Sequence, residues 1–123
     1  MFFTRTCLTV GALLLGATQV YAQGDVARGK ASFAPCAVCH SIEKADNGRG
    51  PSLFGVYGRA AASVEGYRYS SALKASGLQW DDANLSLWLK SPTTLVPGTV
   101  MRFFGMSDEG AREDMISYLK TLK

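Results

Sequence analysis

Two cysteines and a histidine lie close together in the segment Cys36-Ala37-Val38-Cys39-His40. This spacing is typical of covalent haem attachment. Residues three positions apart lie on one face of a helical turn, so both thiols can reach the vinyl groups on one edge of a porphyrin. The imidazole of His40 can then serve as an axial ligand of the iron. The segment therefore predicts one haem c, held by thioethers from Cys36 and Cys39.

The N-terminus has the pattern of a cleaved secretory signal over residues 1–22. Arg5 supplies its positive charge, an apolar run follows, and the segment ends in the small residue Ala22. The apolar run is shorter than the ~18–20 residues that a membrane span needs, which argues against a retained anchor or stable membrane insertion. We expect cleavage before Gln23, export to the periplasm and a mature domain over residues 23–123.

Three other interpretations of the cysteine segment stay open on the sequence alone. A structural zinc site takes four protein ligands, but only Cys36, Cys39 and His40 remain once Cys7 leaves with the signal. A thioredoxin-like redox pair should follow a strand, whereas residues 25–34 have a helical pattern. A disulfide between the two cysteines, the main competitor of haem, gives the histidine no role.

Composition and charge narrow the class of protein further. A chain of 123 residues has the length of one domain, and 47% hydrophobic residues with 19% charged ones indicate a globular fold. The formal net charge of +3 is too weak to favour nucleic acid or a polybasic membrane surface. No pair of carboxylates and no nucleophile–base set indicates an enzyme.

The apolar spacing predicts helices and no strand. Asp25 can cap a first helix, in which Val26, Gly29 and Phe33 form one face, and Pro35 ends it. A short helix is expected over residues 70–76. A further helix begins at Asp81 and ends at Pro92, and its apolar stripe consists of Leu85, Trp88 and Leu89.

The C-terminal third is predicted to be a loop followed by a helix. Residues 93–105 hold two glycines and a further proline, so we expect no regular helix there. Ser107 is the predicted cap of the last helix. The buried face of that helix is predicted to consist of Met115, Tyr118, Leu119 and Leu122.

His40 is the only histidine, so a second axial ligand from this chain must be another residue type. A methionine thioether favours ferrous iron and raises the reduction potential. Met115 lies on an apolar stripe and fits the core. Met101 follows an irregular turn that can carry its side chain over a flat ligand, which favours it over Met106, although methionine is also a common filler of cores.

Pro51 follows a glycine and has a carbonyl but no N–H. A metal-bound histidine usually donates its second ring N–H to a carbonyl or a carboxylate. The carbonyl of Pro51 is therefore a candidate partner of His40. A rigid turn with no contact to the histidine is the equally weighted alternative.

Together these segments resemble class I c-type cytochromes, which are small monohaem electron carriers, over nearly the whole mature chain. The similar segments are residues 24–33, 36–40, 50–59, 97–103 and 115–119. The resemblance implies an all-α, small cytochrome c fold, in which the first and last helices cross and shorter helices and loops wrap around one covalent haem. It also selects Met101 as the axial methionine and Pro51 as the acceptor for His40.

The resemblance also implies which residues bind the haem propionates. Arg59, Tyr69 and Trp80 match residues that hold the buried propionate, and Thr99 matches a further propionate contact. Their N–H and O–H groups suit a carboxylate in a poorly hydrated site. The two aromatic residues also fit an ordinary core.

Two positions depart from the family pattern. Trp88 stands where most members have a tyrosine, and Leu73 stands where an asparagine often orders a buried water. The loss of both polar groups predicts a drier methionine side with a weaker hydrogen-bond network.

The charge around the methionine loop also differs from members with lysine-rich rims. Residues 91–101 carry no charge, and the nearest bases are Lys90, Arg102, Lys44 and Arg49. We expect a small, mostly apolar patch that docks transiently on a donor and an acceptor protein, with modest salt dependence.

The resemblance implies a monomeric periplasmic electron carrier with His40 and Met101 as iron ligands. One alternative is a haem-bearing subunit of a larger oxidoreductase, which the sequence does not distinguish from a free carrier. A haem peroxidase or gas sensor with a labile sixth ligand would need an acid or base over an open iron position, and no second histidine exists to supply it.

Overall fold

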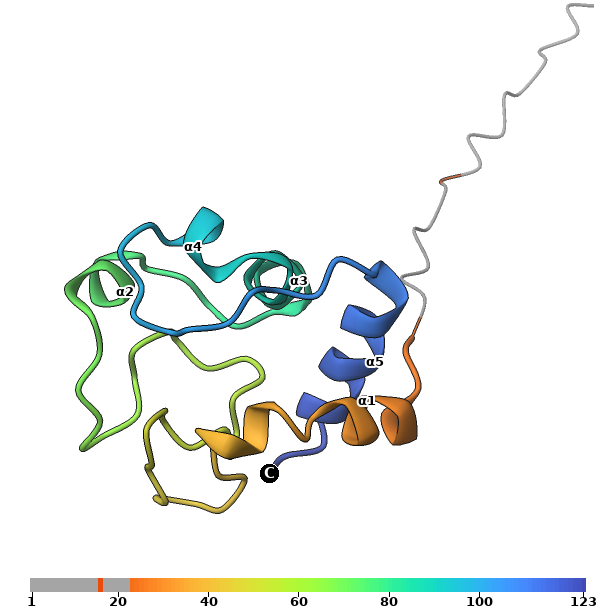
Figure 1. Cartoon of the computed structure of the whole chain (residues 1–123), viewed down its shortest axis with the longest axis horizontal. Coiled ribbons are helices and arrows are strands. Elements are labelled where there is room, and N and C mark those ends of the chain that lie inside the picture. Colours follow the sequence, from red (N-terminus) through yellow and green to blue (C-terminus); the bar gives the residue numbers. More distant parts are fainter. Residues whose placement is uncertain (1–15, 17–22) are drawn as a thin grey trace, which may run out of the picture.

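The computed structural model describes Gly16 and residues 23–123. Within this part the chain forms five α-helices and one turn of 3₁₀ helix, linked by long loops (Figure 1). The described residues form no strand, and one isolated antiparallel bridge joins Ala60 to Gln79. The predicted signal segment lies outside the described residues except for Gly16. No helix in the described part combines the length and the hydropathy needed to cross a membrane.

The first helix, α1 (Val26–Ser32), begins at Asp25, whose carboxylate accepts a hydrogen bond from the Arg28 N–H at 2.8 Å. Gly29 and Phe33 are buried, as predicted. Val26 is 45% exposed, so its predicted place on the buried face is wrong. The glycine lets α1 touch its partner helix over a narrow strip, and Val26 lies beside that strip.

A single 3₁₀ turn, η1 (Cys36–Val38), follows α1 after Pro35. The N–H groups of Cys36 and Ala37 both donate to the carbonyl oxygen of Phe33, at 2.8 and 3.1 Å. The attachment segment is therefore fixed directly to the end of α1.

The middle of the chain supplies two helices. A serine hydroxyl at Ser70 caps the short α2 (Ser71–Ala75), and the carboxylate of Asp81 caps α3 (Asp82–Lys90). The predicted apolar stripe of α3 is buried; its residues are Leu85, Trp88 and Leu89.

Pro92 ends α3, as predicted, but it also begins α4 (Pro92–Leu95). The prediction that residues 93–105 contain no helix is therefore wrong for the first three of them. Proline is tolerated at the first helical position, because its missing N–H has no partner there anyway. The stretch from Val96 onward is irregular as expected.

The last helix, α5 (Glu109–Leu119), begins one residue later than predicted. Asp108 is its cap and accepts from the Ala111 N–H at 2.7 Å, so the assignment of this role to Ser107 is wrong. The carbonyl of Ser107 instead accepts a hydrogen bond from Arg112. The predicted buried residues are all in the core: Met115, Tyr118, Leu119 and Leu122.

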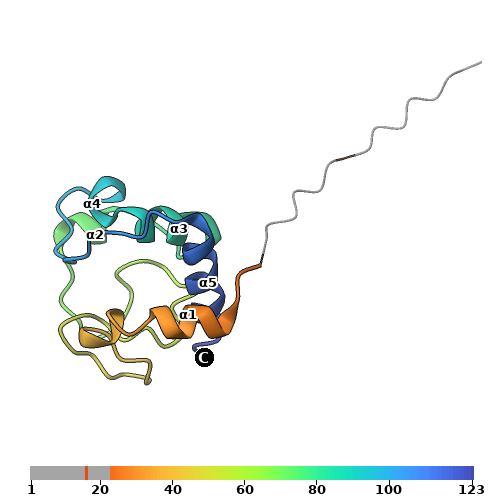
Figure 2. The ribbon, with the colours of Figure 1, turned by 45° about the vertical axis from the view of Figure 1, so that its right-hand side comes forward.

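Helices α1 and α5 cross on one side of the molecule, while α2, α3 and α4 lie on another (Figures 1 and 2). Gly29 makes the crossing close, because a Cβ at this position would overlap the carbonyl oxygen of Asp114. The rings of Phe33 and Tyr118 meet edge to face, with centroids 5.2 Å apart. The predicted contact of the first and last helices is thus present.

A carboxylate reinforces this crossing and gives it a pH dependence. Asp114 accepts from the Asp25 N–H at 2.6 Å and from Arg28 Nε at 2.9 Å. The Arg28 hydrogen bond, with that of the Asp25 N–H, holds the pKa of the Asp114 carboxyl below its usual value. The stabilisation is therefore complete above the unfolded-state pKa, near 3.9, and is lost as the pH falls through the lower pKa of the folded protein.

We expect Asp114→Asn to lower the free energy of unfolding at pH 7, and this difference from the native protein should shrink as the solution becomes acidic. Urea unfolding of the haem-containing protein at stepped pH values measures it. Asp46→Asn, at an exposed loop position, is the matched control. A difference that stays constant down to about pH 2 would show that the ionised carboxylate adds no stability.

Candidate haem site

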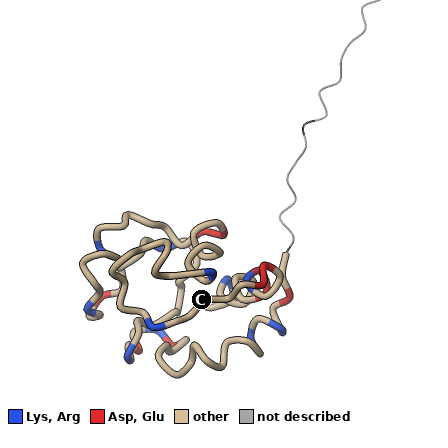
Figure 3. Tube along the Cα trace, turned by 45° about the horizontal axis from the view of Figure 1, so that its top comes forward, with Lys and Arg blue, Asp and Glu red and all other residues tan. Residues whose placement is uncertain are grey.

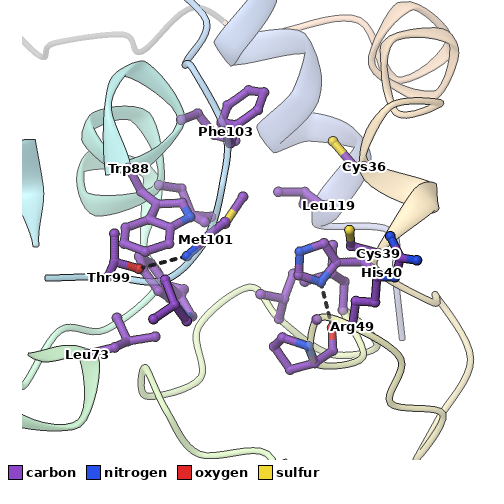
Figure 4. A pocket seen from close by; sticks show the side chains of 18 of the residues that line it. Cys36, Cys39, His40, Arg49, Leu73, Trp88, Thr99, Met101, Phe103 and Leu119 are labelled. Atoms are coloured by element: carbon purple, nitrogen blue, oxygen red, sulfur yellow. Dashed lines mark hydrogen bonds between the residues drawn. The ribbon is translucent and has the colours of Figure 1, made fainter. Parts of the chain in front are cut away.

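A cavity of about 490 Å³ lies between η1, the two longer helices α3 and α5, and the loops that join them. This volume falls within the range typical of ligand pockets, about 300–1,000 Å³. Its walls are mostly apolar and aromatic (Figure 4). All the residues that the sequence selected line this one cavity: Cys36, Cys39, His40, Pro51, Arg59, Tyr69, Trp80, Thr99 and Met101.

The two cysteines occupy one side of the cavity as free, half-buried thiols. The N–H groups of Cys39 and His40 both donate to the Cys36 carbonyl, at 3.1 and 3.0 Å, which closes the helical turn. Figure 4 shows both sulfur atoms on the wall that carries His40. Burial raises the pKa of the Cys36 thiol. The two thiols are not joined as the disulfide alternative requires, and no group of three metal-ligating side chains is assembled within residues 23–123.

A backbone carbonyl orients the imidazole of His40. Its Nδ1 lies 2.7 Å from the carbonyl oxygen of Pro51, so Nδ1–H donates and Nε2 keeps its lone pair for the cavity. Burial lowers the pKa of His40, the Pro51 carbonyl opposes this, and the nearby Arg59 adds to the lowering. The ring is therefore neutral and suited to bind a metal.

Gly50 is the residue that allows this arrangement. A Cβ there would lie 2.5 Å from Cε1 of the His40 ring. Its N–H also donates to the Cys39 carbonyl at 2.9 Å, which ties the proline loop to the attachment segment. Of the two alternatives for Pro51, the structure brings its carbonyl to the histidine.

Met101 lies on the opposite wall, and its side chain faces His40 across the cavity (Figure 4). The Met101 N–H points to the Thr99 hydroxyl at 3.5 Å, a long hydrogen bond. Met106 is not among the described residues that line the cavity; its side chain packs against the hydrophobic core, and its N–H is bound to the Leu89 carbonyl at 2.7 Å. The arrangement thus favours Met101 over Met106 as a ligand.

The predicted propionate donors all line the cavity but come from different walls: Arg59 is held at the proline loop, whereas Thr99 lies beside Met101 (Figure 4). Arg59 uses Nη1 and Nη2 on the carbonyls of Phe54 and Ser52, both at 2.9 Å, and a guanidinium has five N–H donors in all. Burial lowers the pKa of Arg59. The Tyr69 oxygen accepts from the Val64 N–H at 3.1 Å, which leaves its own O–H free to donate.

The site contains two positions that the sequence did not single out. Ser52 is only 2% exposed, and its carbonyl is one of the two that hold Arg59. The Tyr67 hydroxyl donates to the Arg49 carbonyl at 2.7 Å, and its ring packs against Tyr69 at 4.8 Å. No spacing or motif points to Ser52, whereas the position of Tyr67 two residues before Tyr69 could have suggested a shared face.

The two departures from the family pattern lie on the methionine side of the cavity. Leu73 and Trp88 both line it near Met101 (Figure 4). The ring of Trp88 packs against Trp80, with centroids 5.2 Å apart. The drier methionine side that the sequence predicts stays a prediction.

The donor set fits an iron porphyrin. A neutral imidazole and a thioether face each other, two thiols lie beside the imidazole, and the walls are mostly apolar with a few polar donors among them (Figure 4). Fold and site together define a small helical protein built around one covalently attached haem, which is the c-type cytochrome class.

Comparison with known proteins leads to the same class. The family model described as "Cytochrome c" matches residues 26–123. The chain is 46% identical to cytochrome c of Euglena viridis over 101 residues, which cover 81% of this chain and 99% of that protein. It is 45% identical over 93 residues to cytochrome c2 iso-2 of Magnetospirillum molischianum, covering 76% and 96% of the two chains. The structure of cytochrome cH from Methylobacterium extorquens has a TM-score of 0.76 and 52% identity, and it covers 80% of this chain and 99% of its own.

The chain therefore belongs to the cytochrome c family. This family binds one haem c covalently through a pair of cysteines, and its members transfer electrons to redox partners and are not enzymes. The predicted all-α cytochrome c fold and the predicted cofactor are confirmed.

Proposed function

We propose that this protein is a periplasmic one-electron carrier whose haem iron is bound by His40 and Met101. The observation that carries the proposal is the placement of these two side chains on facing walls of one cavity, beside the two cysteine thiols. The haem supplies the Fe(II)/Fe(III) couple. His40 and Met101 would both stay bound in the two oxidation states, because each is fixed in its own loop on facing walls of the cavity (Figure 4).

The surrounding residues have distinct tasks in this proposal. The Pro51 carbonyl orients the imidazole through Nδ1–H. Arg59, Tyr69 and Trp80, which all line the cavity, would hold the buried propionate, and Thr99 would add a further contact. The apolar walls exclude water, which favours the less charged ferrous state.

Export and transient docking complete the proposed function. The signal pattern of residues 1–22 supports a periplasmic location. Basic and acidic residues are interspersed around the trace (Figure 3), so we expect weak long-range attraction between a monomer and its donor and acceptor proteins.

Production in a host with haem-ligation machinery tests this proposal. We expect a coloured protein whose mass equals residues 23–123 plus one haem, and a weak far-red band in the oxidised spectrum that reports a sulfur–iron bond. Carbon monoxide should leave the reduced spectrum unchanged, because no iron position is open. A colourless product with the mass of bare polypeptide would contradict haem attachment, and rapid binding of carbon monoxide would contradict the two-ligand site.

A further inference from the structure

The loop that carries Met101 also displays an aromatic side chain to solvent. Phe104 is fully exposed, with a relative accessibility of 108%, and Val100 on the same loop is 68% exposed. Phe104 is the most exposed large hydrophobic residue in the described part of the chain. Exposed apolar side chains that lie together, as Val100 and Phe104 do on one loop, are typical of surfaces that bind another molecule.

The exposure of Phe104 follows from how its neighbours are fixed. Phe103 is half-buried and lines the haem cavity, whereas Phe104, the next residue, is exposed and is not among the residues that line that cavity. Gly105 has φ of +102°, and a Cβ there would overlap the Lys90 carbonyl. Met106 then donates its N–H to the Leu89 carbonyl at 2.7 Å. The backbone on both sides of Phe104 is therefore held, and its outward position is part of the fold.

A shallow hollow lies on the outer side of the same loop. Thr93 and Phe104 border only this hollow, whereas residues 99–103, which include Met101 and Arg102, line both the hollow and the haem cavity. A group seated in the hollow is thus separated from the haem site only by the ligand loop. The path for an electron between the haem and a partner seated in the hollow is therefore short.

The charges around the hollow indicate what could dock there. Between residues 83 and 107 the only charged residues are Lys90 and Arg102, which are both basic and both exposed. The backbone of Lys90 lies against Gly105, the residue that follows Phe104, because a Cβ on Gly105 would overlap the Lys90 carbonyl. The surface therefore combines an apolar centre with a sparse basic rim.

We propose that Phe104 is the apolar anchor with which this protein docks on its redox partner, a protein that offers an apolar pocket bordered by one or two carboxylates. The inference rests on the proposed electron-carrier function. Arg102 and Lys90 pair with the carboxylates and set the orientation, while the phenyl ring supplies most of the affinity. Aromatic side chains in a desolvated centre dominate many interfaces, and rim charges contribute mainly to the rate of association.

The test uses the haem-containing protein with membranes from the organism that encodes the chain, and measures its oxidation and reduction at several salt concentrations. We expect Phe104→Ser to raise KM on the order of tenfold with kcat little changed, and the effect should persist at high salt. Arg102→Gln should raise KM at low salt only. Leu87→Ser removes another exposed apolar side chain, 52% accessible and on α3, and should change nothing.

A second measurement uses a surface of known chemistry, a gold electrode coated with mixed methyl- and carboxylate-terminated thiols. We expect the native protein and Leu87→Ser to adsorb equally, and Phe104→Ser to lose most of its electroactive coverage. Equal adsorption of all three proteins, or equal KM values with the membranes, would overturn the proposal. A concentration-dependent dimer that Phe104→Ser abolishes in sedimentation would also overturn it, since the patch would then pair two copies of this chain.

The two proposals fail in different ways. A native protein that neither accepts nor donates electrons with the membranes would refute the carrier function, whatever the variants do. The docking inference is judged by the difference between variants, which the electrode measures without any biological partner. An unchanged far-red band in Phe104→Ser will show that the iron site is intact.

Discussion

Replacing Met101 with alanine is expected to open the sixth coordination position of the haem iron. The far-red band of the oxidised protein should disappear, and the reduced protein should bind carbon monoxide. Because axial ligands together span about 0.8 V of haem potential, we expect loss of the thioether to lower the midpoint by an amount on the order of 0.1 V. Visible spectroscopy and redox titration measure all three effects.

Met106→Ala is the matched control, because it removes a thioether five residues away whose backbone is tied to α3. It should keep the band, exclude carbon monoxide and leave the potential close to the native value. If the band survives in Met101→Ala and is lost in Met106→Ala, the assignment of the ligand is wrong. Loss in both variants would show that the band reports the packing of the whole loop.

The Gly29→Ala variant should unfold far more readily than the native protein, although alanine is the better helix former. Within a helix alanine is favoured over glycine by about 0.5–1 kcal/mol. Here the added Cβ would overlap the carbonyl oxygen of Asp114 and also press on the Cβ of Tyr118, at 2.8 Å. Since overpacking typically costs about 1–3 kcal/mol and the main obstacle here is backbone, we expect a net loss of about 3 kcal/mol.

Thermal unfolding followed by far-ultraviolet circular dichroism checks this expectation. A loss of that size corresponds to a fall in Tm of roughly 10–20 °C for a domain of this length. Gly110→Ala is the matched control in the partner helix, because the nearest atom to its new Cβ is a flexible carboxylate oxygen at 3.4 Å. It should retain or slightly raise Tm. An unchanged Tm in Gly29→Ala would mean that the helices can separate without loss of stability.

The parts of this protein that were predictable from sequence are those set by local spacing. Cys36, Cys39 and His40 share a single turn, so their common wall follows from helical geometry alone. The burial of Met115 and Tyr118 follows in the same way from a periodic apolar stripe. Local spacing could not predict that Met101 lies opposite His40, because the two residues are 61 positions apart in the sequence. That prediction came from the resemblance to a known family.

The predictions from sequence were wrong where contacts between distant segments determine which residue caps a helix or becomes buried. Ser107 and Asp108 are both good caps, and the choice of Asp108 coincides with a bond from Arg112 to the Ser107 carbonyl. Val26 matches the helical period of Gly29, yet the crossing with α5 is too narrow to cover both. Ser52 has no sequence signal, because its burial depends on the loop that surrounds Arg59.

The crossing of α1 with α5 joins the first and last parts of the domain, and this sets an order of events during maturation. In a chain that is made from its N-terminus, residues 36–40 are available well before residues 109–119, which later pack on α1. The thiols are then still reachable, and a ligation enzyme can work on an open strand of polypeptide. The α1–α5 crossing, and with it the complete cavity wall, can form only once residues 109–119 are available.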